Sequence, residues 1–160
     1  MSRERRTPAA SRVVMTEIVL PADTNNYGTI FGGRLLALAD KCAAMSAVRH
    51  CRRPVVTASF DRVDFLRPVR RGYFVVLTGE VTATFRTSME IQVTVEAEHP
   101  ERGERQTTCL ARVTMVAIDE AGRPVAVPPL EFDSEDERAR AERAAERRRQ
   151  RLARRDLEAF

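Results

Sequence analysis

The stretch that decides the fold is Pro21–Asp40, whose sequence is PADTNNYGTIFGGRLLALAD. It begins as a polar loop, continues through the glycine pair Gly32–Gly33, and ends in the first turns of an apolar helix. Two glycines at a helix start leave backbone N–H groups open to close approach by a ligand. Asp40 lies two turns into the apolar part, where a carboxylate is unusual unless it pairs with a cation or takes part in chemistry. We therefore expect the rest of the chain to build a pocket around this junction.

The helix predicted over residues 30–50 is apolar or small on most of its faces, a pattern typical of a buried helix. One segment with strand character precedes it and four follow it, joined by short turns; their residues are 13–20, 55–65, 73–85, 87–99 and 105–118. Short connections favour antiparallel pairing. The pattern predicts an α+β fold in which a curved antiparallel sheet wraps around one long central helix.

The alternation of side chains is clearest in the segment 87–99. One face carries Met89, Ile91, Val93 and Val95, and the other carries Glu90, Gln92, Thr94 and Glu96. Gly79, inside the preceding strand, marks either a β-bulge or a point of close contact.

The 160 residues are expected to form one domain over residues 13–130. Residues 1–12 are polar and basic, which predicts a disordered leader. Residues 131–160 form a charged, arginine-rich tail of strongly helical composition. Its apolar stripe is thin, consisting of Ala141, Ala144, Ala145 and Leu152. The pattern favours a solvated or frayed helix over a packed one.

The net charge of +4 is smaller than the number of arginines clustered in one part of this tail, so it says little about a site, and no nucleic-acid partner is expected. The clustered arginines are Arg147, Arg148, Arg149, Arg151, Arg154 and Arg155. No apolar run approaches membrane-spanning length. The three cysteines, Cys42, Cys51 and Cys109, have no metal-ligand spacing, and no segment reads as a signal peptide. A reduced, cytoplasmic setting without a bound metal is the expectation.

Several blocks of the sequence, taken in order, resemble the hotdog-fold acyl-CoA thioesterases. The active-site segment of that family is similar to Pro21–Asp40. Its later blocks are similar to Val55–Thr57, to Asp64–Val69 with Gly72, to Thr87–Glu90, and to Thr114–Asp119 followed by Gly122, Pro124 and Pro128. The resemblance covers roughly residues 12–130. Two residues depart from the family pattern: Phe85 stands where many relatives carry glycine, and Ala39 where methionine or isoleucine often precedes the aspartate.

The resemblance implies a hotdog dimer, in which two sheets join edge to edge and the active sites form at the interface. It also implies further assembly into a trimer of dimers, a hexamer. The activity implied is hydrolysis of acyl-CoA to a free carboxylic acid and CoA, with no cofactor.

The family's site residues map onto four positions. Asn25 matches the active-site asparagine, Asp40 the catalytic aspartate, and Gly32 and Gly33 the turn that holds the thioester carbonyl. Helix-start N–H groups suit a developing oxyanion. Asp40 would act as general base, or as a nucleophile that forms an anhydride, and Asn25 would orient water or the carbonyl.

Structural explanations compete with these assignments. The glycine pair could be only a tight junction, Asp40 could pair with Arg34 or Lys41, and Asn25 could serve a turn.

CoA carries a pyrophosphate and a 3′-phosphate, so arginines are expected around its site. The candidates for contact with CoA are Thr57, Arg67, Arg71, Arg86, Thr87 and Ser88. Each arginine could equally be an ordinary surface residue, and packing would explain Thr57 as well.

No Ser-His-Asp or nucleophilic cysteine arrangement is visible. His50 and His99 fall at element ends, where structural or exposed roles are expected, and the cysteines read as small apolar fillers. The leading hypothesis is an acyl-CoA thioesterase; the alternative is a non-catalytic acyl-CoA-binding regulator. A hotdog dehydratase ranks last, because Phe31 stands where it would need a histidine.

Overall fold

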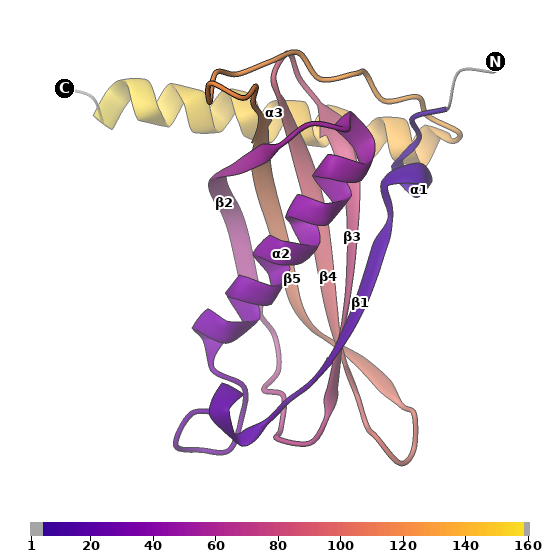
Figure 1. Ribbon diagram of the computed structural model, residues 1–160, viewed down its shortest axis with the longest axis vertical. Helices are drawn as coiled ribbons and strands as arrows, with labels where there is room; N and C mark the ends of the chain where they lie inside the picture. Colours follow the sequence, from indigo (N-terminus) through magenta and orange to yellow (C-terminus); the bar gives the residue numbers. More distant parts are fainter. Residues whose placement is uncertain (1–4, 159–160) are drawn as a thin grey trace.

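The computed structural model describes residues 5–158, which form one five-stranded antiparallel sheet and its covering helices (Figure 1). The elements, in chain order, are α1 (Pro8–Ser11), β1 (Val13–Ile18), a 3-10 turn (Pro21–Asp23), α2 (Gly32–Cys51), β2 (Val55–Phe65), β3 (Phe74–Thr84), β4 (Ser88–Glu98), β5 (Arg105–Ala117) and α3 (Glu135–Glu158). The strand order across the sheet is β1-β3-β4-β5-β2.

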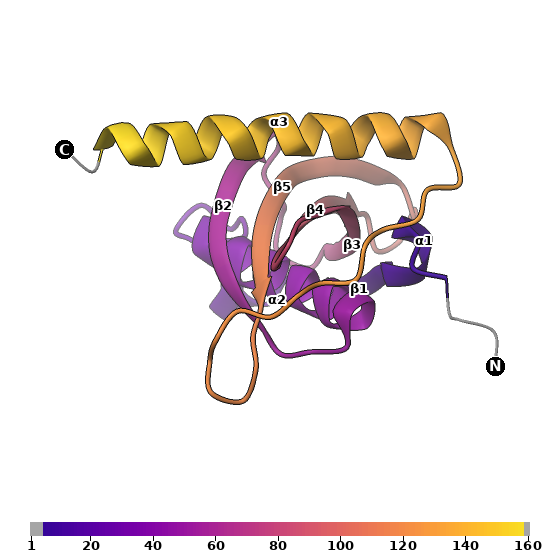
Figure 2. The same cartoon turned by 90° about the horizontal axis from the view of Figure 1, so that it is seen from above.

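The sheet curves around α2, which fills its concave face, while α3 crosses the opposite, convex face (Figure 2). The core lies between α2 and the concave side of the sheet. Leu38, Cys42, Ala43 and Ala47 of α2 belong to one buried cluster with Met89, Ile91, Val93 and Val95 of β4. The predicted α+β hotdog architecture and the inward face of β4 are both confirmed.

Gly79 is a point of close contact between β3 and α2. A β-carbon at Gly79 would lie 2.9 Å from Cys42 Sγ and 3.2 Å from the Cys42 carbonyl oxygen. The register shift of β3 against β4 falls between Val81 and Ala83 instead. Of the two sequence interpretations of Gly79, close contact is the right one.

The predicted disordered leader is wrong for part of its length, because residues 8–11 form the short helix α1. Thr7 caps it by accepting a hydrogen bond from the Ala10 N–H, and Pro8 suits the first helical turn. Ser11 is buried and accepts a hydrogen bond from the Val81 N–H at 2.9 Å, next to the irregularity in β3. The Thr7–Pro8 pair was the local signal for this helix. Residues 1–4 of the predicted leader lie outside the described residues.

The tail forms a long helix, as predicted, but the expectation of a solvated or frayed helix is wrong. Ala144 is buried against the sheet, and Arg147 makes a 2.6 Å ion pair with Glu90, whose side chain is only 4% exposed. Arg140 pairs with Glu80 of β3, and Arg151 pairs with Asp61 of β2 at 2.6 Å. The helix is therefore held less by its thin apolar stripe than by acids on the convex face of the sheet, and it packs on the same unit as the rest of the chain.

β2 forms one edge of the sheet and has a single strand partner, β5, among the described residues. Large apolar side chains lie open along this strand and along the outer face of α2: Phe31, Met45, Val48, Val56, Phe65 and Leu66. A long edge strand bordered by open apolar groups is a surface suited to pairing with another chain.

Within residues 5–158, no helix is both long enough and apolar enough to cross a membrane.

Candidate active site

Asp40 and Thr57 meet where the outer face of α2 packs beside β2. The Thr57 hydroxyl donates a hydrogen bond to Asp40 Oδ1 at 2.6 Å, and Asp40 is half-buried. Arg34, which the sequence offered as an ion-pair partner, binds Asp23 at 2.9 Å instead. Across the described residues, Asp40 has no ion pair. Its carboxylate is thus oriented by a neutral donor and keeps its second oxygen for another contact.

The start of α2 presents backbone donors to a groove. Phe31 is the N-cap residue, and the N–H groups of Gly32 and Gly33 have no acceptor within the described part of the chain. A groove of about 330 Å³ borders this point and runs over Phe65 and Leu66. The position therefore combines unpaired N–H groups, the positive end of a 20-residue helix and an apolar wall.

The two glycines differ in their surroundings. A β-carbon on Gly33 would come within 2.7 Å of the Phe31 ring, whereas one on Gly32 would only touch Phe65 at 3.7 Å. Gly33 is the position of the two that a side chain would disturb, although the exposed Phe31 ring has room to move.

Asn25 organises the loop before the helix. Its Oδ1 accepts hydrogen bonds from the N–H groups of Tyr27 and Thr29, and its side chain also contacts the Thr29 hydroxyl at 3.0 Å. This is the turn-forming role that the sequence left open, and Thr29 is a partner that sequence reasoning missed. The Nδ2 group has two hydrogens, and Thr29 accounts for one of them.

Within one chain, Asp40 lies far from the backbone N–H groups at the start of α2. Asp40 lies eight residues after Gly32 on the same helix, a separation of about 12 Å at 1.5 Å per residue. A general base and an oxyanion donor must both lie about 3 Å from the reacting groups of a single thioester. Asn25 and the glycines share one end of α2, whereas Asp40 and Thr57 lie further along it.

The residues expected to contact CoA fall into two groups at opposite ends of the sheet. Arg67 and Arg71 lie in the connection between β2 and β3, near the start of α2, where the Arg71 N–H donates to the Gly28 carbonyl. Arg86, Thr87 and Ser88 lie at the turn between β3 and β4, at the far end. Thr57 joins neither group, because it contacts Asp40.

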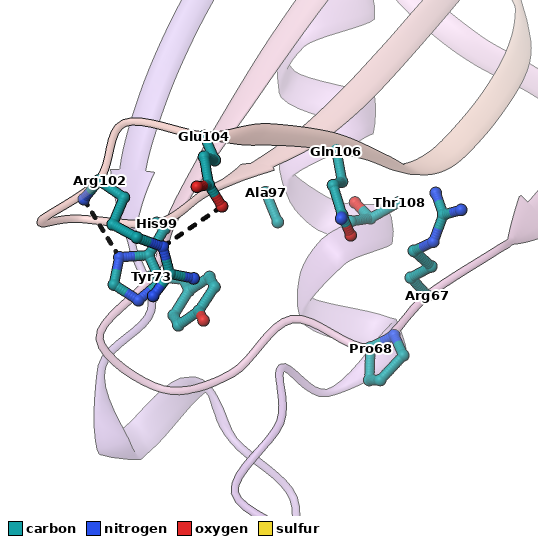
Figure 3. A pocket seen from close by; sticks show the side chains of 9 residues that line it. All are labelled: Arg67, Pro68, Tyr73, Ala97, His99, Arg102, Glu104, Gln106 and Thr108. Carbon is teal, nitrogen blue, oxygen red and sulfur yellow. Dashed lines mark hydrogen bonds and ion pairs between the residues drawn. The ribbon is translucent and has the colours of Figure 1, made fainter.

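His99 has a structural role at the end of β4. Its Nδ1 accepts hydrogen bonds from the N–H groups of Glu101 and Arg102, and its ring packs edge-on against Tyr73 at 5.0 Å. Figure 3 shows this histidine in a small cavity of about 120 Å³, with Arg67 at the other end of it. Neither Asp40 nor a helix-start glycine lines this cavity.

The other histidine, His50, and the three cysteines are buried, and none of them forms a hydrogen bond with Asp40 among the described residues. His50 lies at the end of α2, within 2.8 Å of the Pro128 carbonyl oxygen, and burial lowers its pKa. Burial also raises the pKa of Cys42 and of Cys109 to about 11, which leaves almost no thiolate at neutral pH. These residues match the structural roles expected for them.

Two comparisons relate this sequence to known proteins. The profile of the thioesterase superfamily matches residues 27–104. An uncharacterized acyl-CoA thioester hydrolase of Bacillus subtilis is 46% identical over 134 residues, which are 84% of this chain and 78% of that protein.

Two solved structures superpose closely. One is an apo-hexameric acyl-CoA thioesterase, with a TM-score of 0.87 and 44% identity over 92% of this chain and 95% of its own. The other is an acyl-CoA hydrolase of Staphylococcus aureus in complex with butyryl coenzyme A and coenzyme A, with a TM-score of 0.88 and 32% identity over 97% and 94%. The Staphylococcus enzyme has also been solved with an asparagine, an aspartate and a threonine each replaced by alanine.

The fold, the order of the sequence blocks and the identity to the Bacillus protein agree with one another. This chain belongs to the thioesterase superfamily and is a hotdog-fold acyl-CoA thioesterase.

Proposed function

We propose that the protein hydrolyses acyl-CoA at a site shared between two copies of the chain, with Asp40 as general base. The Asp40–Thr57 hydrogen bond carries this proposal, because it holds a half-buried carboxylate in a fixed orientation without neutralising it. Asp40 takes a proton from a water molecule while the water oxygen adds to the thioester carbonyl carbon. The C–S bond then breaks, and the proton passes to the departing CoA sulfur.

The second copy supplies what one chain lacks. About 12 Å of helix separates Asp40 from Gly32, so one thioester cannot reach both within a single chain. Antiparallel pairing of two β2 edges would bring the start of one α2 beside the middle of the other. The open apolar side chains along β2 and α2 support this contact, as does the hexameric state of the related thioesterase. We propose a dimer of this kind, assembled further into a trimer of dimers.

At this shared site the helix start would receive the carbonyl oxygen. The free N–H groups of Gly32 and Gly33 would donate to the developing oxyanion. Asn25 would orient the carbonyl or the water with the amide hydrogen that its loop does not use. The groove over Phe65 and Leu66 is suited to the acyl chain.

The spacing of three residues gives independent support. The asparagine, aspartate and threonine replaced in the Staphylococcus enzyme are separated by 15 and 17 residues, and Asn25, Asp40 and Thr57 have the same separations. We propose that these three residues have corresponding roles here, Thr57 being a positioning residue for Asp40.

The CoA moiety would extend from the thioester toward basic and hydroxyl side chains. Arg67 and Arg71 from one end of a sheet, and Arg86, Thr87 and Ser88 from the other, become neighbours only when a second copy is turned end for end beside the first. We propose these residues as its contacts and a cytoplasmic setting for the enzyme. The CoA thioester is the substrate, CoA is a product, and the steps above use no cofactor.

The test is steady-state hydrolysis of a panel of acyl-CoA substrates, followed with a thiol reagent, for wild type beside Asp40→Asn. The two side chains have nearly the same shape, so the oligomer should remain intact by size-exclusion chromatography. We expect kcat to fall at least a hundredfold. Full activity of the variant would exclude Asp40 as the base, and tight CoA binding by wild type without hydrolysis of any chain length would favour the regulator hypothesis.

A further inference from the structure

β2, the strand that carries Thr57, is interrupted twice. Its pairing with β5 skips Ala58 and then Asp61, so the register shifts on both sides of residues 59 and 60. Bulges of this kind bend a strand and leave the extra residue unpaired. β2 is also an edge strand, whose single strand partner within residues 5–158 is β5. The ladder therefore fixes this part of β2 less firmly than it fixes the central strands.

The first bulge decides which way Thr57 points. In a regular strand, residues 57 and 59 would lie on the same face. Here the Thr57 hydroxyl bonds to Asp40 of α2, on the concave side of the sheet. Ser59 instead donates a hydrogen bond to Asp61 at 3.0 Å, and Asp61 pairs with Arg151 of α3 on the convex side. The bulge thus aims Thr57 at α2, and a change in its shape would move the Thr57 hydroxyl.

The Asp61 carboxylate, at the second bulge, joins β2 to two other elements. Its Oδ2 accepts hydrogen bonds from Arg151 Nη1 at 2.6 Å and from the Thr114 hydroxyl of β5 at 3.1 Å. Arg151 Nη1 also donates to Thr114 Oγ1 at 3.0 Å. The side chains of Asp61 and Arg151 are only 11% and 24% exposed, so water weakens this ion pair less than it weakens a surface pair. The network ties α3, β2 and β5 together.

β5 is held by the same network directly beside Thr57. Met115, which follows Thr114 on β5, is the partner of Thr57 in the ladder. Its Sδ atom lies 3.5 Å from Thr57 Oγ1. Both strands are therefore tied to α3 within a few residues of the hydroxyl that orients Asp40.

We propose that Arg151 is a positioning residue for the catalytic carboxylate. It holds the bulged part of β2 through Asp61, and β2 in turn holds Thr57 against Asp40. The proposal rests on the proposed function, because it takes Asp40 to be the base. A base displaced by about 1 Å from its reactive geometry loses much of its rate. Arg151 contacts neither Asp40 nor the thioester, so its loss lowers kcat and leaves KM unchanged.

The first test compares Arg151→Gln with a matched control in acyl-CoA hydrolysis. The control is Arg140→Gln, which breaks another ion pair between α3 and the sheet, at Glu80, whose side chain is 12% exposed. We expect kcat to fall about fivefold or more in Arg151→Gln, at a KM within about twofold of wild type, and less in Arg151→Lys. The control should keep kcat within about twofold.

Three kinetic outcomes would overturn the proposal. A wild-type kcat in Arg151→Gln would show that the network does not position the base. Equal losses in Arg151→Gln and Arg140→Gln would show that only the docking of α3 matters. A rise in KM at unchanged kcat would show that Arg151 contacts the substrate.

A double-mutant cycle tests whether Arg151 acts through Thr57. Thr57→Val keeps the shape of the side chain but removes the donor to Asp40. In this background, Arg151→Gln should lower kcat by less than about twofold, because the hydrogen bond it protects is already gone. A purely structural role would persist in both backgrounds, so an undiminished loss of kcat would contradict the proposal.

Hydrogen–deuterium exchange of the full-length oligomer separates this proposal from the proposed function. Arg151→Gln should speed the exchange of peptides within residues 55–65 at least about threefold, and Arg140→Gln should change it less than about twofold. Unchanged exchange in Arg151→Gln would overturn the proposal at any level of activity. Full activity of Asp40→Asn would contradict the proposed function, whereas the exchange result would still show that Arg151 holds β2.

Discussion

Two helices cover the two faces of one sheet, and they do so with opposite chemistry. α2 fills the concave face with small and apolar side chains such as Leu38, Cys42 and Ala43, all fully or nearly fully buried. α3 crosses the convex face with arginines that reach acids on the strands. The first contact depends on shape and the second on charge.

The two helices place different requirements on the strand residues that they contact. Close packing of α2 needs a glycine at position 79 of β3, because a side chain there would meet Cys42. α3 instead needs partners of opposite sign, and Arg147 offsets the charge of the buried Glu90 carboxylate, which also accepts a hydrogen bond from the Thr82 hydroxyl. Substitutions on the two faces should therefore lower the stability of the protein for different physical reasons.

The largest effect is expected on the α2 side. Leu38→Ala removes a side chain that is 2% exposed and leaves a cavity, which should lower the free energy of unfolding by about 2–5 kcal/mol. Leu157→Ala, the same change at a 79% exposed position of α3, should cost less than about 0.5 kcal/mol. Denaturant unfolding at a fixed protein concentration measures both. Equal losses would mean that the two helices are buried alike.

On the α3 side, Arg147→Ala should cost about 3 kcal/mol, because it leaves the Glu90 carboxylate buried without its partner. The control is Arg149→Ala, which breaks an exposed pair with Glu146 and should cost under about 1 kcal/mol. Unfolding of both variants at low and at 1 M salt tests the reason. Salt should shrink the small Arg149 effect far more than the Arg147 effect, and the reverse would show that α3 is held only at its surface.

Gly79→Ala tests the close approach of β3 to α2 and should cost about 1–3 kcal/mol through overpacking against Cys42. A paired Cys42→Ala substitution makes room at the sulfur but not at the Cys42 carbonyl oxygen. The double variant should therefore recover only part of the loss in thermal unfolding. Wild-type stability of Gly79→Ala alone would contradict the contact.

The smallest effect concerns His50, where the end of α2 meets the segment leading to α3. Burial lowers the pKa of His50, so the unfolded chain takes up a proton at a higher pH than the folded one. The stabilisation due to neutral His50 is therefore present above its unfolded pKa and is lost as the pH falls. Unfolding measured between pH 7.5 and 5.5 should show a shallower pH slope for His50→Gln than for wild type, and an unchanged slope would show that His50 titrates alike in both states.

The sequence predicted the α2 side well because its pattern is local. Residues 55–65 were expected as a strand and form β2, and the inward face of β4 follows from the alternation of its side chains. The α3 side could not be predicted in this way. The acids that hold it, such as Glu90, occupy strand positions that a period of two assigns to solvent, and nothing local shows that a distant helix covers them.

The candidate site likewise has features that the sequence predicted and features that it did not. The residues Asn25, Gly32, Gly33 and Asp40 stood out from the sequence because of their neighbours and the family resemblance. The hydrogen bond between Asp40 and Thr57 required the packing of α2 beside β2. The apolar groove wall at Phe65 and Leu66 was also missed, because it forms where the end of β2 meets the start of α2. The sequence signal for this wall was the pair Phe65 and Leu66, two large apolar residues at the end of a predicted strand.

The central claim is that the start of α2 in one copy works with Asp40 of another. Co-expression of Asp40→Asn and Asn25→Ala chains carrying different affinity tags, followed by purification through both tags, gives mixed oligomers of two variants that are each expected to be inactive. In a shared site, one pairing of the two chains brings an intact Asn25 to an intact Asp40. We predict recovery of roughly a quarter of the wild-type kcat per chain. No recovery above the separate variants would place both residues in a site made by one chain and contradict the account.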